Sequence, residues 1–247
     1  MKISAVIPTR NRAASLNRAL QSLLNQTRLP DEIIVVDSSD DKESLDCLKK
    51  MFHRYPVVWI DSVPSVCTQR NIGIRMARGN WIFLCDDDVE LEAQYLEELQ
   101  RYVGSDEQCG AAAGLWLQLE SNRWIYQYPV RGFGELMFRF VFQLSIWGDL
   151  HLIKTPVFVR PLYALVKKYF IARGNGFTLA GWPLITNWDG NVIRTSIYSL
   201  GACLIKKEWL LHSGYDEVLD PSGLGDNYGV AINFPAEKAI HVLPSTH

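Results

Sequence analysis

Acidic side chains follow two apolar runs of this sequence. Asp37 comes directly after residues 33–36 (IIVV), and residues 81–85 (WIFLC) are followed by Asp86, Asp87 and Asp88. Three adjacent carboxylates repel one another unless a cation or hydrogen bonds compensate. Oxygen ligands suit a hard divalent cation such as Mg²⁺ or Mn²⁺. Such an ion would bridge to a diphosphate and neutralise charge on a departing phosphate.

The elements that position these acids alternate between strands and helices. Helical spacing of apolar residues separates the predicted strands, which are 3–7, 33–36, 57–60, 81–85, 111–117 and 197–205. This alternation indicates an α/β fold with a mainly parallel twisted sheet and helices on both faces. Because ligands bind beyond the carboxyl ends of such strands, we expect Asp37 and the three later aspartates at one edge. We predict that their two strands are neighbours.

Each of these residues also has a structural interpretation. Residues 86–88 could cap a helix that begins near Val89, and Asp37 could lie in a solvated turn. In an extended segment Asp86 and Asp88 would point the same way and could serve one ion. Arg70, which enters a predicted helix over 69–77, could contact a base or phosphate or could simply lie at the surface.

Composition and charge limit the classes of protein to which this chain can belong. The 247 residues carry a net charge of −2, 48% are hydrophobic and 21% are charged, which is typical of a globular protein and does not indicate nucleic-acid binding. The five cysteines are scattered, which favours free thiols in a reducing compartment. No run approaches the roughly 18 apolar residues of a membrane span, and no signal peptide is evident. We therefore expect a cytoplasmic protein.

Six segments, taken together, resemble glycosyltransferase family 2, which has the GT-A fold. In chain order they are VIPTRNR (6–12), EIIVVDSS (32–39), QRNIG (69–73), ARGNWIFLCDDDV (77–89), GACLIKK (201–207) and GYDE (214–217). The resemblance covers roughly residues 1–120 and 195–235. It implies an inverting, metal-assisted transfer of a sugar from a nucleoside diphosphate sugar, usually a UDP-sugar, to a glycan or lipid-linked acceptor.

The resemblance also implies roles for single residues. Asp37 would hydrogen-bond the nucleotide base, with Arg70 beside it. Asp86 would lie near the ribose, and Asp88 with Asp86 would hold Mg²⁺ or Mn²⁺ at the diphosphate. The other residues expected to contact the donor are Pro8, Thr9, Arg10, Asn11, Asn71 and Asp87.

The same resemblance places the general base at Asp226, in GLGDNY (223–228). Here Gly225 replaces the usual glutamate, and VAIN (230–233) replaces an arginine-rich segment. Asp216 and Glu217 are competitors for the role, although in the family they look more structural. Asp226 could also be a polar residue of a glycine-rich turn. His241 and His247 are further candidate metal ligands.

Residues 131–173 differ in composition from the rest of the chain. They hold nine aromatic residues and seven basic residues against two acidic ones. This composition suits peripheral contact with an anionic membrane surface at its inner face. A helical subregion that packs its aromatics inward explains it equally well.

These patterns divide the chain into a nucleotide-sugar-binding half (1–120) and an acceptor-binding half (121–247). Two other functions compete with sugar transfer. A sugar nucleotidyltransferase would need a glycine-rich opening loop, which Pro8-Thr9-Arg10-Asn11 lacks. A non-catalytic module that binds nucleotide sugars or glycans would keep Asp37 and residues 86–88 without a working base.

Overall fold

The computed structural model describes residues 1–120, 122–126, 130–148, 150, 153–186, 192–219, 226–237, 239–244 and 246, with residues 118, 120 and 123–126 described by their backbone. Gly225 and His247 lie outside the described residues. No helix of the described part is both long enough and apolar enough to cross a bilayer.

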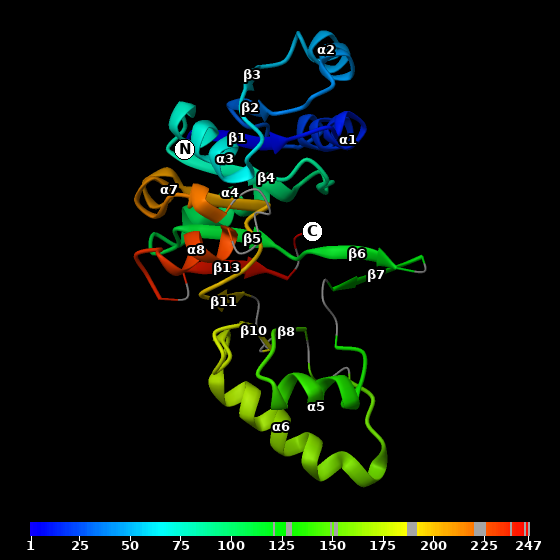
Figure 1. Ribbon diagram of the computed structural model, residues 1–247. Helices are drawn as coiled ribbons and strands as arrows, with labels where there is room; N and C mark the ends of the chain where they lie inside the picture. Colours follow the sequence, from blue (N-terminus) through cyan, green and yellow to red (C-terminus); the bar gives the residue numbers. More distant parts are fainter. Residues whose placement is uncertain are drawn as a thin grey trace.

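An eight-stranded sheet forms the body of the molecule, in the order β11-β13-β5-β12-β4-β1-β2-β3 (Figure 1). The strands are β1 (Ile3–Thr9), β2 (Glu32–Asp37), β3 (Val57–Asp61), β4 (Trp81–Cys85), β5 (Ala111–Gly114), β11 (Ile193–Thr195), β12 (Ala202–Lys206) and β13 (Ile240–Leu243). β12 is antiparallel to β4 and β5, and β11 is antiparallel to β13. The other strands run in one direction, so the expected mainly parallel sheet is confirmed.

Helices cover both faces of this sheet, as the sequence predicts. One face packs against α1 (Ala13–Leu24), α2 (Lys42–Met51) and α4 (Tyr95–Ser105). The other packs against α3 (Val66–Met76), α7 (Lys207–Ser213) and α8 (Asp226–Ile232). Within β4, Phe83 enters the first core and Leu84 the second. A strand covered on both faces is apolar throughout, which explains the uninterrupted runs of the sequence.

The expectation that β2 and β4 are neighbours is wrong, because β1 lies between them. β1 pairs in parallel with both strands, and Thr9 lies opposite Asp37 in the register. The first strand is central because each crossover helix returns the chain to one side of it or the other. Asp37 and Asp86 nevertheless lie at the same edge of the sheet, since all three strands run in parallel.

Helix α3 lies close to this edge for reasons visible in its sequence. The Ser65 hydroxyl caps the helix by accepting a hydrogen bond from the Thr68 amide at 3.0 Å. Gly73 lets the helix approach the sheet, since a Cβ there would lie 2.3 Å from Val6 Cγ1. Gln69 donates from Nε2 to the carbonyls of Thr9 and Val36, at 2.8 and 2.7 Å. These bonds fix α3 to the ends of β1 and β2.

Apart from β11, the chain between β5 and β12 builds a subregion whose helices and small sheet lie below the large sheet in Figure 1. Its elements are β6 (Leu117–Glu120), β7 (Arg123–Tyr126), α5 (Phe133–Val141), β8 (Ile146–Trp147), η2 (Val157–Val159), α6 (Arg160–Arg173), β9 (Gly176–Phe177) and β10 (Pro183–Ile185). β8, β10 and β9 form a small sheet. A separate core forms here from Leu136, Ile146, Leu150, Val166, Phe170 and Leu184.

Two sequence-based strand boundaries need correction. The run 111–117 is not one strand, because β5 ends at Gly114 and Leu117 begins the β6–β7 hairpin. Within 197–205 only the part from Ala202 onward is strand. The apolar residues that flank these strands, such as Leu115 after β5 and Leu200 before β12, are buried in the core rather than paired in the sheet. A 3₁₀ helix, η3 (Glu217–Leu219), lies between α7 and α8.

Candidate active site

The carboxyl ends of β1, β2 and β4 bring polar side chains to one edge of the sheet. Thr9 ends β1, Asp37 ends β2, and Asp86 follows β4. Because these strands are adjacent and parallel, the three positions lie side by side, as the sequence indicates.

The aspartates after β4 lie in a turn and not at a helix N-terminus. The Val89 amide donates to the Asp86 carbonyl at 3.5 Å, and α4 begins only at Tyr95. The helix-capping interpretation is therefore wrong. The extended geometry expected for Asp86 and Asp88 is also absent, because the turn sends their side chains to different arginines.

Arg12 donates hydrogen bonds to two of these aspartates, Asp87 and Asp88. Its Nη1 donates to Asp87 Oδ1 at 3.2 Å and to Asp88 Oδ2 at 2.9 Å. Thr9 donates its hydroxyl to Asp87 Oδ2 at 2.7 Å. Burial raises the pKa of Asp87, while the bonds from Thr9 and Arg12 oppose that rise. Asp87 therefore fixes the turn against β1, and the half-exposed Asp88 faces outward.

Arg70 connects the third acid to the far end of the chain. Its Nη2 donates to Asp86 Oδ1 at 2.7 Å, and its Nη1 donates to Asp226 Oδ2. Arg70 and Asp226 are only 5% and 8% exposed. The guanidinium lies 5.1 Å from the centre of the Tyr215 ring. Burial raises the pKa of Asp226, and the charge of Arg70 opposes that rise.

This arrangement brings Asp226, the general base that the resemblance implies, to the sheet edge. Asp226 begins α8, and its Oδ1 accepts a hydrogen bond from the Asn227 amide at 2.6 Å. The competitors have other partners: Asp216 accepts from the Val218 amide, and Glu217 accepts from Asn71. Of these three acids, Asp226 is the one that contacts Arg70.

A second group of charges surrounds Asp37, which is buried. Its Oδ1 accepts from the Ser39 amide at 2.8 Å, and its Oδ2 accepts from Lys42 Nζ at 2.9 Å. Lys42 also reaches Asp61 Oδ1 at 2.9 Å. The hydrogen bond from Lys42 lowers the pKa of Asp61.

The remaining predicted donor residues support the loops of this edge. Asn11, with φ of 55°, exchanges hydrogen bonds with Asp40, and Arg10 pairs with the same carboxylate at 3.2 Å. Pro8 lies within β1, opposite Val36.

Asn71 contacts the segment that precedes α8, not Asp37. Its Nδ2 donates to the Tyr215 carbonyl at 2.8 Å and to Glu217 Oε1 at 2.9 Å, and its Oδ1 accepts from the Tyr215 amide. Asn71 thus ties α3 to the segment that precedes α8.

Among the carboxylates of the acidic edge, Asp88 is the one suited to bind a divalent cation. Among the residues that the structure describes, no three His, Cys, Asp or Glu side chains converge as metal ligands. Both Asp86 and Asp88 accept from arginines, but Asp86 contacts the buried Arg70 whereas Asp88 is half-exposed. His241 lies on β13, with Nδ1 2.8 Å from the Tyr102 hydroxyl, and two strands separate β13 from β4. A metal here would be anchored by Asp88 and completed by oxygens of a bound diphosphate.

Three residues of this edge were not predicted from the sequence. Arg12 and Lys42 neutralise the acids, and Gly201 leaves room for Asp86, since a Cβ there would lie 2.0 Å from Asp86 Oδ2. Arg12 and Gly201 both lie in segments that carry the family resemblance (6–12 and 201–207), so the resemblance could have identified them. Nothing in the local pattern assigns Lys42 to Asp37, because the lysine is surrounded by acids in the sequence.

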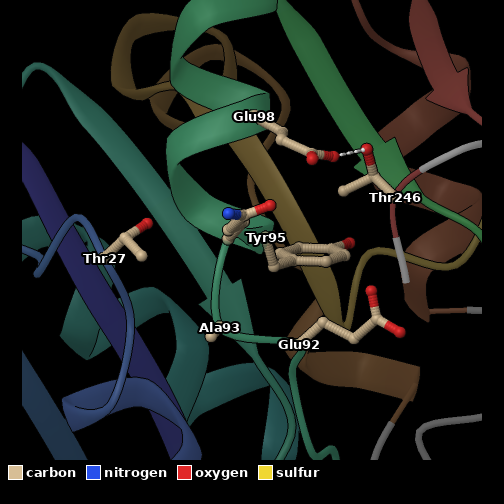
Figure 2. A pocket seen from close by; sticks show the side chains of 7 residues that line it. Thr27, Glu92, Ala93, Tyr95, Glu98 and Thr246 are labelled. Carbon is tan, nitrogen blue, oxygen red and sulfur yellow. Dashed lines mark hydrogen bonds between the residues drawn. The ribbon is translucent and has the colours of Figure 1, made fainter.

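A cavity of about 390 Å³ lies elsewhere, beside the start of α4 (Figure 2). Its lining residues are Thr27, Glu92, Ala93, Gln94, Tyr95, Glu98 and Thr246. Thr246 donates its hydroxyl to Glu98, which attaches the last described residue to α4. None of the predicted donor residues lines this cavity.

Parts of this sequence are similar to known proteins. The model of glycosyl transferase family 2 matches residues 4–151. An uncharacterized glycosyltransferase of Bacillus subtilis, YwdF, is 35% identical over 105 residues, covering 42% of this chain and 38% of that protein. The poly(ribitol-phosphate) beta-N-acetylglucosaminyltransferase TarP of Staphylococcus aureus is 27% identical over 163 residues, covering 64% and 46%. The chain thus spans less than half the length of these two relatives.

Solved structures share the fold. The crystal structure of S. aureus TarS superposes with a TM-score of 0.57 at 16% identity, covering 99% of this chain and 35% of that one. A second crystal structure, TarS 1-349, gives a TM-score of 0.58 at 15% identity, covering 98% and 58%.

Proposed function

Because the chain belongs to glycosyl transferase family 2 and is a glycosyltransferase, we propose that it transfers a sugar from a nucleoside diphosphate sugar to a glycan or lipid-linked acceptor with inversion at the anomeric carbon. The observation that carries this proposal is the ion-paired chain Asp86–Arg70–Asp226. It joins an acid that follows β4 to an acid from the second half of the sequence. A donor at the sheet edge would have a candidate base beside it.

The nucleobase would bind at Asp37. A carboxylate oxygen accepts more than one hydrogen bond, so Asp37 can accept from the ring N–H of uracil or thymine while it keeps Lys42 or Ser39. Cytosine presents an acceptor at that ring position and would be repelled. This chemistry disfavours a CDP-sugar, and the family resemblance favours a UDP-sugar or a related pyrimidine donor such as a dTDP-sugar.

The diphosphate would lie toward Arg12 and Asp88. The Arg12 guanidinium can donate to phosphate oxygens, and Asp88 would anchor Mg²⁺ or Mn²⁺. When bound, such an ion would offset the negative charge on the departing nucleoside diphosphate.

Asp226 would act as the general base in a single displacement. The acceptor hydroxyl gives its proton to an Asp226 carboxylate oxygen as the hydroxyl oxygen bonds to the anomeric carbon. The bond from that carbon to the diphosphate oxygen breaks, and the nucleoside diphosphate leaves with the electron pair. Attack from the face opposite the leaving group inverts the anomeric carbon. The raised pKa of Asp226 makes it a stronger base than a solvated aspartate.

The acceptor class is supported by one relative. TarP is named for transfer of N-acetylglucosamine to poly(ribitol phosphate), a polymer that carries hydroxyl groups. We therefore favour a glycan or a polyol-based acceptor, lipid-linked or free, for this chain.

Thermal unfolding with UDP-, GDP- and dTDP-sugars, with and without Mn²⁺, tests the donor. A specific donor raises the melting temperature by mass action, and we expect a UDP- or dTDP-sugar to do so more strongly with Mn²⁺. Asp37→Ala should remove this shift, whereas Asp46→Ala, an exposed change on α2, should keep it. No shift with any of the donors would contradict the proposal. A shift without turnover on any acceptor would instead support a binding module.

A further inference from the structure

The outward face of α6 is apolar, and the sugar-transfer site does not account for it. Phe158, in η2 directly before α6, and Leu162 and Leu165 of α6 follow one another at helical spacing and are 85%, 44% and 66% exposed. Next to this face round the helix, Val166 and Phe170 are buried in the core of the subregion. The apolar arc of the helix is therefore wider than the part that the core covers, and the remainder is exposed.

Basic residues flank this apolar face. Residues 153–186 contain no aspartate or glutamate, and their basic residues are Lys154, Arg160, Lys167, Lys168 and Arg173. All of these except Lys167 are exposed. Helix α5 adds exposed Phe138, Val141 and Phe142 to the same subregion.

We propose that this α6 face (Phe158, Leu162 and Leu165) docks on the surface of an anionic lipid bilayer. Large apolar side chains bounded by Lys and Arg suit the boundary between acyl chains and acidic headgroups. Helix α6 has 14 residues, too short to span a bilayer, so it lies in the plane of the interface. The subregion projects from the sheet, which leaves the acidic edge clear of the docked surface (Figure 1).

Charge argues against a second copy of the chain as the occupant. Two α6 faces brought together would place two sets of basic residues side by side, with no acid from residues 153–186 between them. Like charges across an interface are costly. Acidic lipid headgroups supply the missing negative charge.

Flotation with lipid vesicles tests the apolar contact. The chain should bind vesicles that contain phosphatidylglycerol, and Leu165→Ser or Phe158→Ser should weaken binding about tenfold or more, since each removes a large apolar side chain from the interface. Met51→Ser on α2 is the matched control, because Met51 is 55% exposed and distant from α6 in the fold. This control should bind like the unaltered chain. Equal binding by Leu165→Ser, Phe158→Ser and Met51→Ser would overturn the proposal.

The charge contribution is tested separately. Lys168→Gln should weaken binding to acidic vesicles about fivefold, whereas Lys50→Gln on α2 should leave it unchanged. Raising the ionic strength should reduce binding, and neutral phosphatidylcholine vesicles should bind poorly. Equal binding to acidic and neutral vesicles would contradict docking on an anionic surface. An equal loss of vesicle binding in Lys168→Gln and Lys50→Gln would contradict it as well.

Two further readouts complete the test. Sedimentation velocity that shows a dimer dissociated by Leu165→Ser, with no vesicle binding by the unaltered chain, would assign the face to a second copy and overturn the proposal. Donor-induced thermal shifts should be the same for Leu165→Ser and the unaltered chain. Loss of vesicle binding with intact donor binding supports the docking surface independently of the proposed sugar transfer.

Discussion

Arg70 contacts two carboxylates through separate nitrogens of one planar group. Nη2 bonds Asp86, which follows β4, and Nη1 bonds Asp226, which begins α8. A lysine would offer a single ammonium and could not reproduce this fork. The position of the candidate base therefore depends on the shape of the arginine as well as on its charge.

Replacing Asp226 with asparagine keeps an oxygen that can accept from Arg70 but removes the proton acceptor. We expect kcat to fall about 100-fold or more, the usual contribution of a general base, with little change in the Kd of the donor. Steady-state kinetics and donor titration measure the two quantities. Asp216→Asn, which alters the rival acid, should retain activity. A loss of only a few-fold in Asp226→Asn would mean that the base is another group.

Removing the guanidinium should move the pH dependence of catalysis. In the unaltered chain burial raises the pKa of Asp226, and Arg70 limits that rise. Arg70→Ala removes the lowering influence, so the pKa of Asp226 rises further. Because the base must be deprotonated, the acid limb of the kcat/KM profile should shift to higher pH.

The control for this profile is Arg75→Ala, an exposed arginine on the same helix. Its acid limb should match that of the unaltered chain. An unchanged acid limb in Arg70→Ala, or a shift toward lower pH, would refute the coupling between Arg70 and Asp226.

At the scale of single residues, the sequence predicts where a residue lies in the fold better than it predicts which side chains that residue contacts. Asp37 and Asp86 could be assigned to one edge because parallel strands end together. The contact of Arg70 with Asp226 could not, because 156 positions separate them and the contact depends on how α8 packs against α3. The resemblance placed Arg70 beside the nucleobase, a role that stays a prediction.

Among the elements, β12 sets the space available to the acidic turn. Gly201 precedes this strand, and its carbonyl accepts a hydrogen bond from the Asp86 amide at 2.7 Å. The antiparallel pairing of β12 with β4 holds the two segments at this spacing.

Gly201→Ala should therefore displace Asp86, because the added Cβ would lie 2.0 Å from Asp86 Oδ2. We expect a loss of about 1–3 kcal/mol in the free energy of unfolding, as in other overpacked sites. Denaturant unfolding measures the change. Gly104→Ala is the matched control, since nothing lies within 4 Å of its Cβ in α4, and it should be neutral or stabilise by up to about 1 kcal/mol. Equal stabilities for the two variants would contradict the close contact.

The spacing of apolar residues in the sequence predicted the longer strands and helices. Apolar runs predicted β1 to β4, and helical spacing predicted α1 to α4. The position of β1 between β2 and β4 did not follow, because apolar runs carry no information on strand order. The short strands β8 to β11 have two or three residues each, too few for alternation to be recognised.

On the scale of the whole molecule, the buried hydrophobic residues of the described part of the chain form three clusters and not one. Two lie on the faces of the large sheet and share its strands. The third lies between α5, α6 and the small sheet. Phe170 is buried inward, as the packing interpretation of residues 131–173 expects, whereas the exposed Phe158 belongs to the face that we propose docks on a membrane.

The third core should lose its structure without the large sheet doing so. Phe170→Ala removes a fully buried ring from the subregion, at a cost of about 3–5 kcal/mol. Amide hydrogen exchange should accelerate in α5 and α6, while amides of β1, β2 and β4 keep their protection because their cores are unchanged. Ile171→Ala, a partly exposed neighbour on the same helix, should leave exchange in α5 and α6 nearly unaltered. If exchange instead accelerates uniformly along the chain, the subregion and the sheet unfold as one cooperative unit, and docking at α6 would be coupled to the stability of the acidic edge.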